Sequence, residues 1–456
     1  MFTSRTAIIA VSVAVLVAGC GSNSTPVADP VTLPPSTMGP ITTTVDAERG
    51  WIDGEPDWDT APAGDDGTKV LAGGAPGTYA AAAAVDAAVP TASQPGEQQA
   101  GLRAGSVDDN ADFAAFLAYL ARLKDLGIAT RDFDPTGRVV VTVTGTTGLP
   151  IAGAQISVTA DGIQIASLRT TADGTARFLP ALYDAGEVAE FTFSSGDVSA
   201  NAAPGSTVAL QSDALGGSAG PVALDVLFLL DATGSMGDEI GRLKATIDTV
   251  AAQVDAFESQ PDVRFAMTLY RDEGDMFVTS TFDFTGDIAA FRAALSDVVA
   301  DGGGDYPEAF EEGLASALST PTWRDPTSTV QLVFLVADAP PHVDRQVPVE
   351  YPAAVIDAVA RGIKVFPIAS SESDDQAEAV FRQIAAATGA RFVFLSYGAQ
   401  GAATGNATDI DSTDYEELPL DALVVRLIAE ELAALSGTQV ELPPTTVPPV
   451  TNPDGQ

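Results

Sequence analysis

The sequence predicts an α/β protein whose main domain is a doubly wound, mostly parallel sheet, with a smaller all-β sandwich module and a disordered N-terminal stalk. From residue 222 to 437, apolar segments of strand length alternate with segments of helical periodicity. Two of these strands, 225–231 and 330–337, are unbroken apolar runs, as expected of strands buried on both faces. Between 136 and 212, short alternating strands are separated by turns, which is typical of a sandwich.

Residues 1–19 have the pattern of an export signal. Arg5 precedes an apolar run that is too short to span a bilayer comfortably, and the run closes at Val17-Ala18-Gly19-Cys20. This ending resembles the lipobox of bacterial lipoproteins, in which the cysteine is acylated. The resemblance implies a lipid on Cys20 and a chain anchored to the bacterial cell envelope, facing outside the cytoplasm. The alternative is an ordinary signal-peptidase site with an incidental cysteine.

Cysteine usage and net charge exclude several kinds of site. Cys20 is the only cysteine, which excludes an intrachain disulfide and a thiolate metal site. The chain has 22 Lys and Arg against 62 Asp and Glu, a net charge of −40 at pH 7. Such a surface repels nucleic-acid phosphates and attracts cations, so we expect no nucleic-acid partner. Solubility or a saline habitat accounts for the overall charge without a specific role.

Two regions are predicted to be disordered, a stalk at 20–107 and a tail at 438–456. Both are rich in Pro and Thr, and the stalk also in Ala, Gly and Asp, with too few periodic apolar residues to offset the entropy of ordering the backbone. The segment 108–135 is different, because it carries an amphipathic helix that begins at Asp112 and ends at Gly127. We expect its apolar stripe to pack on whatever follows. The stripe consists of Phe113, Phe116, Leu117, Leu120 and Leu123.

The β module begins with a strand near Val139 and turns through residues 145–153 before a second strand. Another turn at 171–175 precedes Phe178. This order of strands and turns resembles the carboxypeptidase-regulatory-like or Ig-like modules of exported proteins. The resemblance implies a spacer.

The main domain, 222–437, alternates strands and helices in an order that predicts a mostly parallel sheet with one antiparallel edge hairpin. The predicted strands are 225–231, 263–271, 276–283, 330–337, 363–368 and 391–395. The predicted helices are 237–258, 287–300, 306–319, 351–361, 375–388 and 421–436.

Three oxygen-rich loops follow the elements of this sheet. The first is Asp231-Ala232-Thr233-Gly234-Ser235, the second is the glycine run before Asp305 and Glu308, and the third begins at Asp338. A doubly wound sheet brings such loops to one edge. Hard oxygen donors suit Mg²⁺, Mn²⁺ or Ca²⁺ rather than zinc. For the first loop alone, helix capping by Asp and Ser is the alternative.

With these loops, 222–437 resembles a von Willebrand factor type A domain with its metal-ion-dependent adhesion site. The resemblance assigns Asp231, Thr233 and Ser235 to the first-loop ligands and Asp338 to the third-loop aspartate. In the second loop the family commonly has a threonine, whereas here Asp305 is the nearest residue and is the expected ligand, with Glu308 also close.

The resemblance implies a binding protein rather than an enzyme. In the family a divalent cation, here most simply Mg²⁺ with Ca²⁺ or Mn²⁺ possible, keeps an open position that a partner's carboxylate completes. We therefore expect an envelope-anchored lipoprotein that docks a protein partner. One alternative is a metal-dependent hydrolase with Asp305 or Glu308 as base; another is an assembly protein with a vestigial site. His342, the sole histidine, excludes a histidine pair, and loop packing is its more common role.

Overall fold

The computed structural model describes residues 51–53, 102–212 and 222–440, except 258, 305, 328, 371–372, 398–401, 404–417 and 439. The predicted signal, Cys20, most of the stalk and Asp305 lie outside the described residues. None of the helices in the described part is both long enough and apolar enough to cross a membrane.

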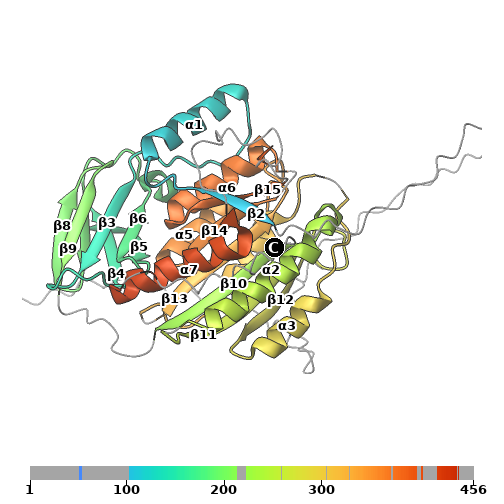
Figure 1. Cartoon of the computed structure of the whole chain (residues 1–456). Coiled ribbons are helices and arrows are strands. Elements are labelled where there is room, and N and C mark those ends of the chain that lie inside the picture. Colours follow the sequence, from blue (N-terminus) through green and yellow to red (C-terminus); the bar gives the residue numbers. More distant parts are fainter. Residues whose placement is uncertain are drawn as a thin grey trace, which may run out of the picture. The chain divides into compact units, whose positions relative to one another are not determined.

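The main domain is built on a large sheet with strand order β1-β12-β11-β10-β13-β14-β15-β2-β17 (Figure 1). Its central strands β11, β10, β13, β14 and β15 are parallel neighbours, while β12 pairs antiparallel with β11 at one side. This confirms the predicted mostly parallel sheet with an antiparallel edge hairpin. The strands are β10 (Ala223–Asp231), β11 (Asp262–Tyr270), β12 (Thr279–Thr285), β13 (Thr329–Ala337), β14 (Lys364–Ala369) and β15 (Phe392–Tyr397), with β16 (Ala402–Ala403) beside β15.

Helices cover both faces of this sheet, which confirms the doubly wound arrangement. One group joins α2, α3 and α7, and the other joins α4, α5 and α6, each through contacts between its own members. β10 and β13 are buried along nearly their whole length, as their unbroken apolar runs predict. The helices are α2 (Gly237–Asp255), α3 (Ile288–Asp297), α4 (Phe310–Ser319), α5 (Tyr351–Arg361), α6 (Asp375–Thr388) and α7 (Leu420–Ser436).

The prediction of a disordered stalk over 20–107 is wrong at its end. Residues Arg103–Val107 form β2, which pairs antiparallel with both β15 and β17 (Leu418–Pro419). Leu102 and Ala104 are buried there. A short strand of small residues has no periodicity to reveal it, and it becomes ordered because it completes the edge of the sheet. Residues Trp51–Asp53 likewise form β1, which pairs with β12 at the opposite edge.

The helix predicted before the β module is confirmed as α1 (Phe113–Leu126). The Asp112 carboxylate accepts a hydrogen bond from the Ala115 amide, and Gly127 ends the helix with φ of 80°. Its packing differs from the prediction, because the buried side chains of Phe116, Tyr119 and Leu123 contact α6 rather than the module that follows. The apolar stripe is therefore a core face whose partner is distant in sequence.

The β module is a sandwich of two small sheets, as predicted. The sheets have orders β6-β3-β9 and β5-β4-β7-β8, and Phe178 of one meets Phe191 of the other with ring centroids 4.9 Å apart. The module contacts the main domain at the amino ends of the parallel strands of the large sheet. There Lys364 of the main domain pairs with Asp173 of the module. The strands are β3 (Val139–Thr144), β4 (Gln155–Ala160), β5 (Ile163–Arg169), β6 (Thr175–Phe178), β7 (Phe191–Ser195), β8 (Val198–Ala202) and β9 (Thr207–Gln211).

Candidate metal centre

The first oxygen-rich loop begins where β10 ends. Asp231 is fully buried, and its Oδ1 accepts hydrogen bonds from the Thr233 amide at 2.9 Å and the Thr233 hydroxyl at 2.6 Å. The Thr233 hydroxyl also lies 3.1 Å from the Ser235 hydroxyl. The structure thus brings the three predicted first-loop oxygens together, with Ser235 on the exposed side.

The second loop packs directly on the first. The Gly234 amide donates to the Gly302 carbonyl at 3.0 Å, and the Asp301 amide donates to the Ala232 carbonyl at 3.0 Å. Gly303 has φ of 72°, and a Cβ on it would lie 2.8 Å from Glu308 Oε1 and 3.0 Å from the Thr233 Cβ. A glycine is therefore needed here for the two loops to meet, and Glu308 lies beside Thr233.

The third loop closes the arrangement. Asp338 follows β13, the strand next to β10, and is 3% exposed. The Glu308 amide donates to the Pro340 carbonyl at 3.2 Å, which joins the second loop to the third. The three loops therefore converge at the carboxyl edge of the sheet. Of the predicted ligands, Asp231, Thr233, Ser235 and Asp338 lie at this edge, and Asp305 lies outside the described residues.

The carboxylates at this edge lie close enough to repel one another. Burial, together with the charge of Asp338, raises the pKa of Asp231 to about 7. Burial raises the pKa of Glu308 to about 8, with further contributions from Asp231, Asp272, Asp338 and Asp275. Both carboxylates therefore hold their protons to a higher pH than an exposed carboxylate does.

A divalent cation fits this donor set. Asp231 Oδ2 and Glu308 Oε2 are buried and accept no hydrogen bond from the described residues, and the nearby Tyr270 hydroxyl makes none of normal geometry either. Hard oxygen donors, charged and neutral, are the ligands that Mg²⁺, Mn²⁺ and Ca²⁺ prefer. The described residues contain no cluster of three or more His, Cys, Asp or Glu side chains arranged to hold a metal. The hydroxyls of Thr233 and Ser235, which lie 3.1 Å apart, would have to supply part of the donor set for such an ion.

Two further carboxylates, Asp272 and Asp275, lie at this edge and are not among the predicted ligands. The residues that end the strand at Tyr270 reach this edge only if the strand is parallel to β10, and β11 is parallel to β10, with Asp231 paired to Tyr270. Asp272 is therefore at the same edge, 4% exposed. Asp275 Oδ2 accepts from the Gly303 amide at 2.8 Å and so supports the second loop. Asp272 and Asp275 lie close together on the turn between β11 and β12, and this pair of carboxylates is the sequence feature that could have indicated them.

His342 has the packing role that was predicted as the more common one. Its side chain is 8% exposed, and Nε2 lies 3.5 Å from Asp272 Oδ1 while Nδ1 lies 3.5 Å from Asp344 Oδ1. It ties the third loop to the end of β11.

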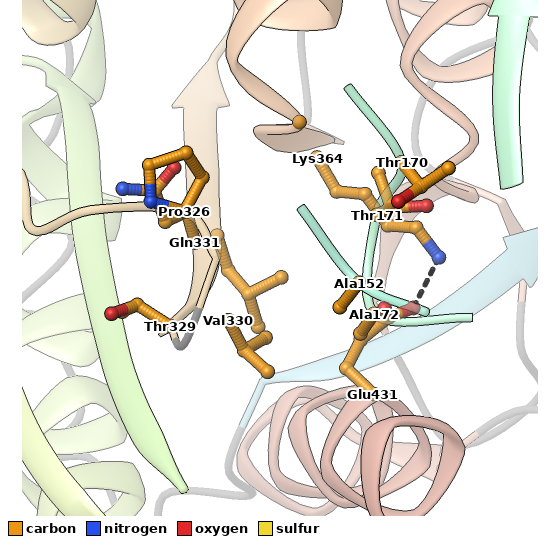
Figure 2. A pocket seen from close by; sticks show the side chains of 12 residues that line it. Ala152, Thr170, Thr171, Ala172, Pro326, Thr329, Val330, Gln331, Lys364 and Glu431 are labelled. Atoms are coloured by element: carbon orange, nitrogen blue, oxygen red, sulfur yellow. Dashed lines mark hydrogen bonds and ion pairs between the residues drawn. The ribbon is translucent and has the colours of Figure 1, made fainter. Parts of the chain in front are cut away.

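A cavity elsewhere in the molecule does not compete with this edge as a ligand site. It lies between the β module and the main domain, and its volume of about 10 Å³ suits a single water molecule. Figure 2 shows Lys364 and Glu431 joined across it, with Nζ 2.6 Å from Oε1. The cavity is part of a structural contact.

Comparison with known proteins shows which family the main domain is similar to. Residues 225–400 match the family model of the von Willebrand factor type A domain. Among curated proteins, the alpha-protein kinase vwkA of Dictyostelium discoideum is 33% identical over 120 residues, which are 26% of this chain and 19% of that protein. A putative ariadne-like RING finger protein, R811, of Acanthamoeba polyphaga mimivirus is 29% identical over 119 residues, 26% of this chain and 11% of that protein. The chain thus spans less than a fifth of either relative.

Solved structures with likeness to this chain include two proteins outside that pair. The pilus adhesin SpaC of Lactobacillus rhamnosus GG, in its open conformation, is 13% identical with a TM-score of 0.33, over 48% of this chain and 31% of SpaC. Proximal thread matrix protein 1 of the mussel byssus, described with a zinc-occupied MIDAS motif, is 16% identical with a TM-score of 0.27, over 36% and 41% of the two chains. At these values the likeness does not define a function.

Proposed function

We propose that the type A domain docks a protein partner through a divalent cation held by Asp231, Thr233, Ser235 and Asp338. One observation supports the proposal: three loops bring the buried side chains of Asp231, Glu308 and Asp338 to one edge of the sheet, where Asp231 Oδ2 and Glu308 Oε2 accept no hydrogen bond of normal geometry from the described residues. A cation held there supplies the missing positive charge, and an oxygen from a partner completes its coordination. In the second loop we assign Glu308 to the cation's surroundings beside the predicted Asp305, because Glu308 lies against Thr233 and Gly303.

The surface around the three loops supports a protein partner. Four large apolar side chains with high exposure lie on the connections that follow β11, α3 and β13 and in the second loop: Met276 is 84% exposed, Val299 61%, Tyr306 48% and Val349 39%. Met276 follows Asp275, and the Tyr306 hydroxyl lies 3.5 Å from the Asp338 carbonyl. A carboxylate flanked by apolar side chains is the partner chemistry that such a rim accommodates.

We also propose that the chain reaches its partner from the cell envelope, anchored by a lipid on Cys20. The motif at 17–20 supports this, and the acidic composition is compatible with a surface protein. Metabolic labelling with a fatty acid tests it: label is expected on the wild-type protein and absent from the Cys20→Ser variant. Equal labelling of the two proteins would contradict the proposed lipid anchor and would leave the proposed docking site unaffected.

The docking site is tested by titrating the full-length chain with Mg²⁺ and Mn²⁺ in a calorimeter. One bound cation is expected for the wild type, and the uptake should be lost in Asp231→Asn, because that change removes a charged ligand. Asp301→Asn is the matched control, since it removes the same charge from the same edge but its carboxylate is 73% exposed. Capture of surface proteins on the immobilised chain should then depend on the cation.

Two results would contradict this function. The first is equal cation uptake by the wild type and Asp231→Asn. The second is a captured partner that remains bound after a chelator is added and that also binds Asp231→Asn.

A further inference from the structure

Arg131 connects the metal edge to a part of the chain outside residues 225–400. It lies between α1 and β3, before the β module, and its side chain is 9% exposed. Its guanidinium donates to Glu311 from Nη2 to Oε2 at 2.6 Å and from Nε to Oε1 at 3.1 Å. Glu311 is 1% exposed and lies in the first turn of α4, directly after the second loop. The pair is therefore a buried, two-point contact behind Glu308.

The other donors of Arg131 reach the loop that follows Asp338. Nη2 donates to the carbonyls of His342 at 2.9 Å and Arg345 at 2.8 Å, and Nη1 donates to the carbonyl of Val343 at 3.3 Å. Residues 342–349 belong to no helix or strand, so their carbonyls lack the partners that regular structure supplies. The fixed fork of one guanidinium thus reaches three of them, the carbonyls of His342 and Arg345 sharing the N–H of Nη2 that Glu311 leaves.

Glu311 extends the same contact to the far end of the loop. Its Oε1 also accepts from the amide of Tyr351, the first residue of α5, at 2.8 Å. The Tyr351 ring in turn stacks on Phe133, with centroids 6.1 Å apart. Arg131 and Glu311 thus fix the loop near its start, at His342, and at its exit into α5.

We propose that Arg131 is a positioning residue for the cation site: it holds the loop after β13 in the arrangement that keeps Asp338 beside Asp231. The inference rests on the proposed function, because it concerns the geometry of that cation site. A ligand shell is only as well placed as the groups that support it, and loss of such support lowers metal affinity. Cation affinity is then set in part by the segment before the β module.

Arg382 offers a matched control for a test. It also joins the segment before the β module to the type A domain by a buried two-point pair, from Nε and Nη2 to the Asp109 carboxylate at 3.0 and 2.6 Å. It is 8% exposed, like Arg131. Its other contacts are Glu378 on α6 and the rings of Tyr119 and Phe116 on α1, and none of its hydrogen bonds goes to residues 342–350.

The test compares Mn²⁺ binding by full-length Arg131→Ala and Arg382→Ala in calorimetric titrations. Both variants are expected to melt at lower temperature, but only Arg131→Ala should raise the Kd for Mn²⁺, by about tenfold or more. Trypsin cleavage after Arg345 should also become faster in Arg131→Ala alone, because its loop has lost three hydrogen bonds. Arg131→Lys keeps the charge without the fork and should recover only part of the affinity.

The outcomes separate this inference from the proposed function. No Mn²⁺ uptake by the wild type overturns the function itself. Uptake by the wild type with an unchanged Kd in Arg131→Ala, or the same rise in Kd in both alanine variants, overturns the role of Arg131. If Arg131→Ala does not fold, the comparison of Arg131→Lys with Arg382→Lys carries the same two outcomes.

Discussion

Two fully buried aspartates stand on the same strand, β10, and the chain treats them in opposite ways. Asp225, near the amino end, receives Arg264 at 2.9 and 2.7 Å and the Arg324 side chain at 3.1 Å. Asp231, at the carboxyl end, accepts hydrogen bonds from the amide and hydroxyl of Thr233 but has no arginine or lysine partner among the described residues, and the neighbouring charge that raises its pKa is another carboxylate, Asp338. The chain thus neutralises the charge of Asp225 internally, whereas under the proposed function a bound cation would neutralise that of Asp231.

The same contrast holds between the two edges of the sheet. At the amino edge, Lys364 is buried between Glu431 at 2.6 Å and Asp173 at 3.1 Å, so a buried cation lies between two carboxylates. At the carboxyl edge, the pKa values of Asp231 and Glu308 are raised by burial and by other carboxylates. Buried charges are normally paired, so a cluster of like charges indicates either strain or a missing ligand.

Replacing Asp225 should lower the stability of the chain without affecting cation uptake. Asp225→Asn removes the charge that two arginines share, and breaking a buried pair costs about 3–5 kcal/mol. We expect about 3 kcal/mol, the lower end, because the Arg264 and Arg324 side chains keep 22% and 19% exposure and regain some hydration. Chemical unfolding of the cation-depleted chain measures this loss, and Mn²⁺ uptake by the folded variant should persist.

Asp231→Asn is the mirror-image variant and the control. It removes a buried charge that has a like-charged neighbour, so the unfolding free energy of the cation-depleted protein at pH 8 should stay level or rise. If Asp231→Asn lost as much stability as Asp225→Asn, both aspartates would be ordinary structural charges, and the contrast between them would be lost.

The fold could be predicted from the sequence where burial imposes a pattern. The runs of β10 and β13 and the helical periodicity of α1 required particular elements, and the structure has them. Hydrophobic periodicity did not predict the segments that become ordered by pairing with residues distant in the sequence. β2 consists of Arg, Ala, Gly, Ser and Val, and it is a strand because β15 and β17 lie on either side of it.

Some residues of the candidate site could be predicted from the sequence, and others could not. Asp231 and Asp338 end apolar strands, and the rule that ligands gather at the carboxyl edge was enough to place them together. Asp272 lies at this edge only if its strand is parallel to β10, and local periodicity does not give the direction of a strand. Arg131 was missed for a stronger reason, since its partners lie on α4 and the third loop and nothing in its own segment marks it.

The pH dependence of cation-induced stabilisation is expected to be a smaller effect than the loss of stability in Asp225→Asn. In the folded chain the pKa values of Asp231 and Glu308 are raised from 3.8 to about 7 and from 4.5 to about 8. Between about pH 4 and pH 8 the folded state therefore holds protons that the unfolded state has released, and the unfolding free energy of the cation-depleted chain falls as pH rises. A bound cation removes this fall, because it takes the place of the protons on both carboxylates.

The gain in unfolding free energy on adding Mn²⁺ should consequently grow from pH 5.5 to pH 8. At pH 8 and a free concentration of one hundred times Kd, it should reach about 2.7 kcal/mol. Chemical unfolding with Mn²⁺ or with a chelator at three pH values measures it, and Asp231→Asn should show little gain at any of them. A gain of equal size at pH 5.5 and pH 8 would contradict the prediction, because protons would then not compete with the ion for Asp231 and Glu308. The carboxyl edge would in that case resemble the amino edge, with its charges already compensated within the chain.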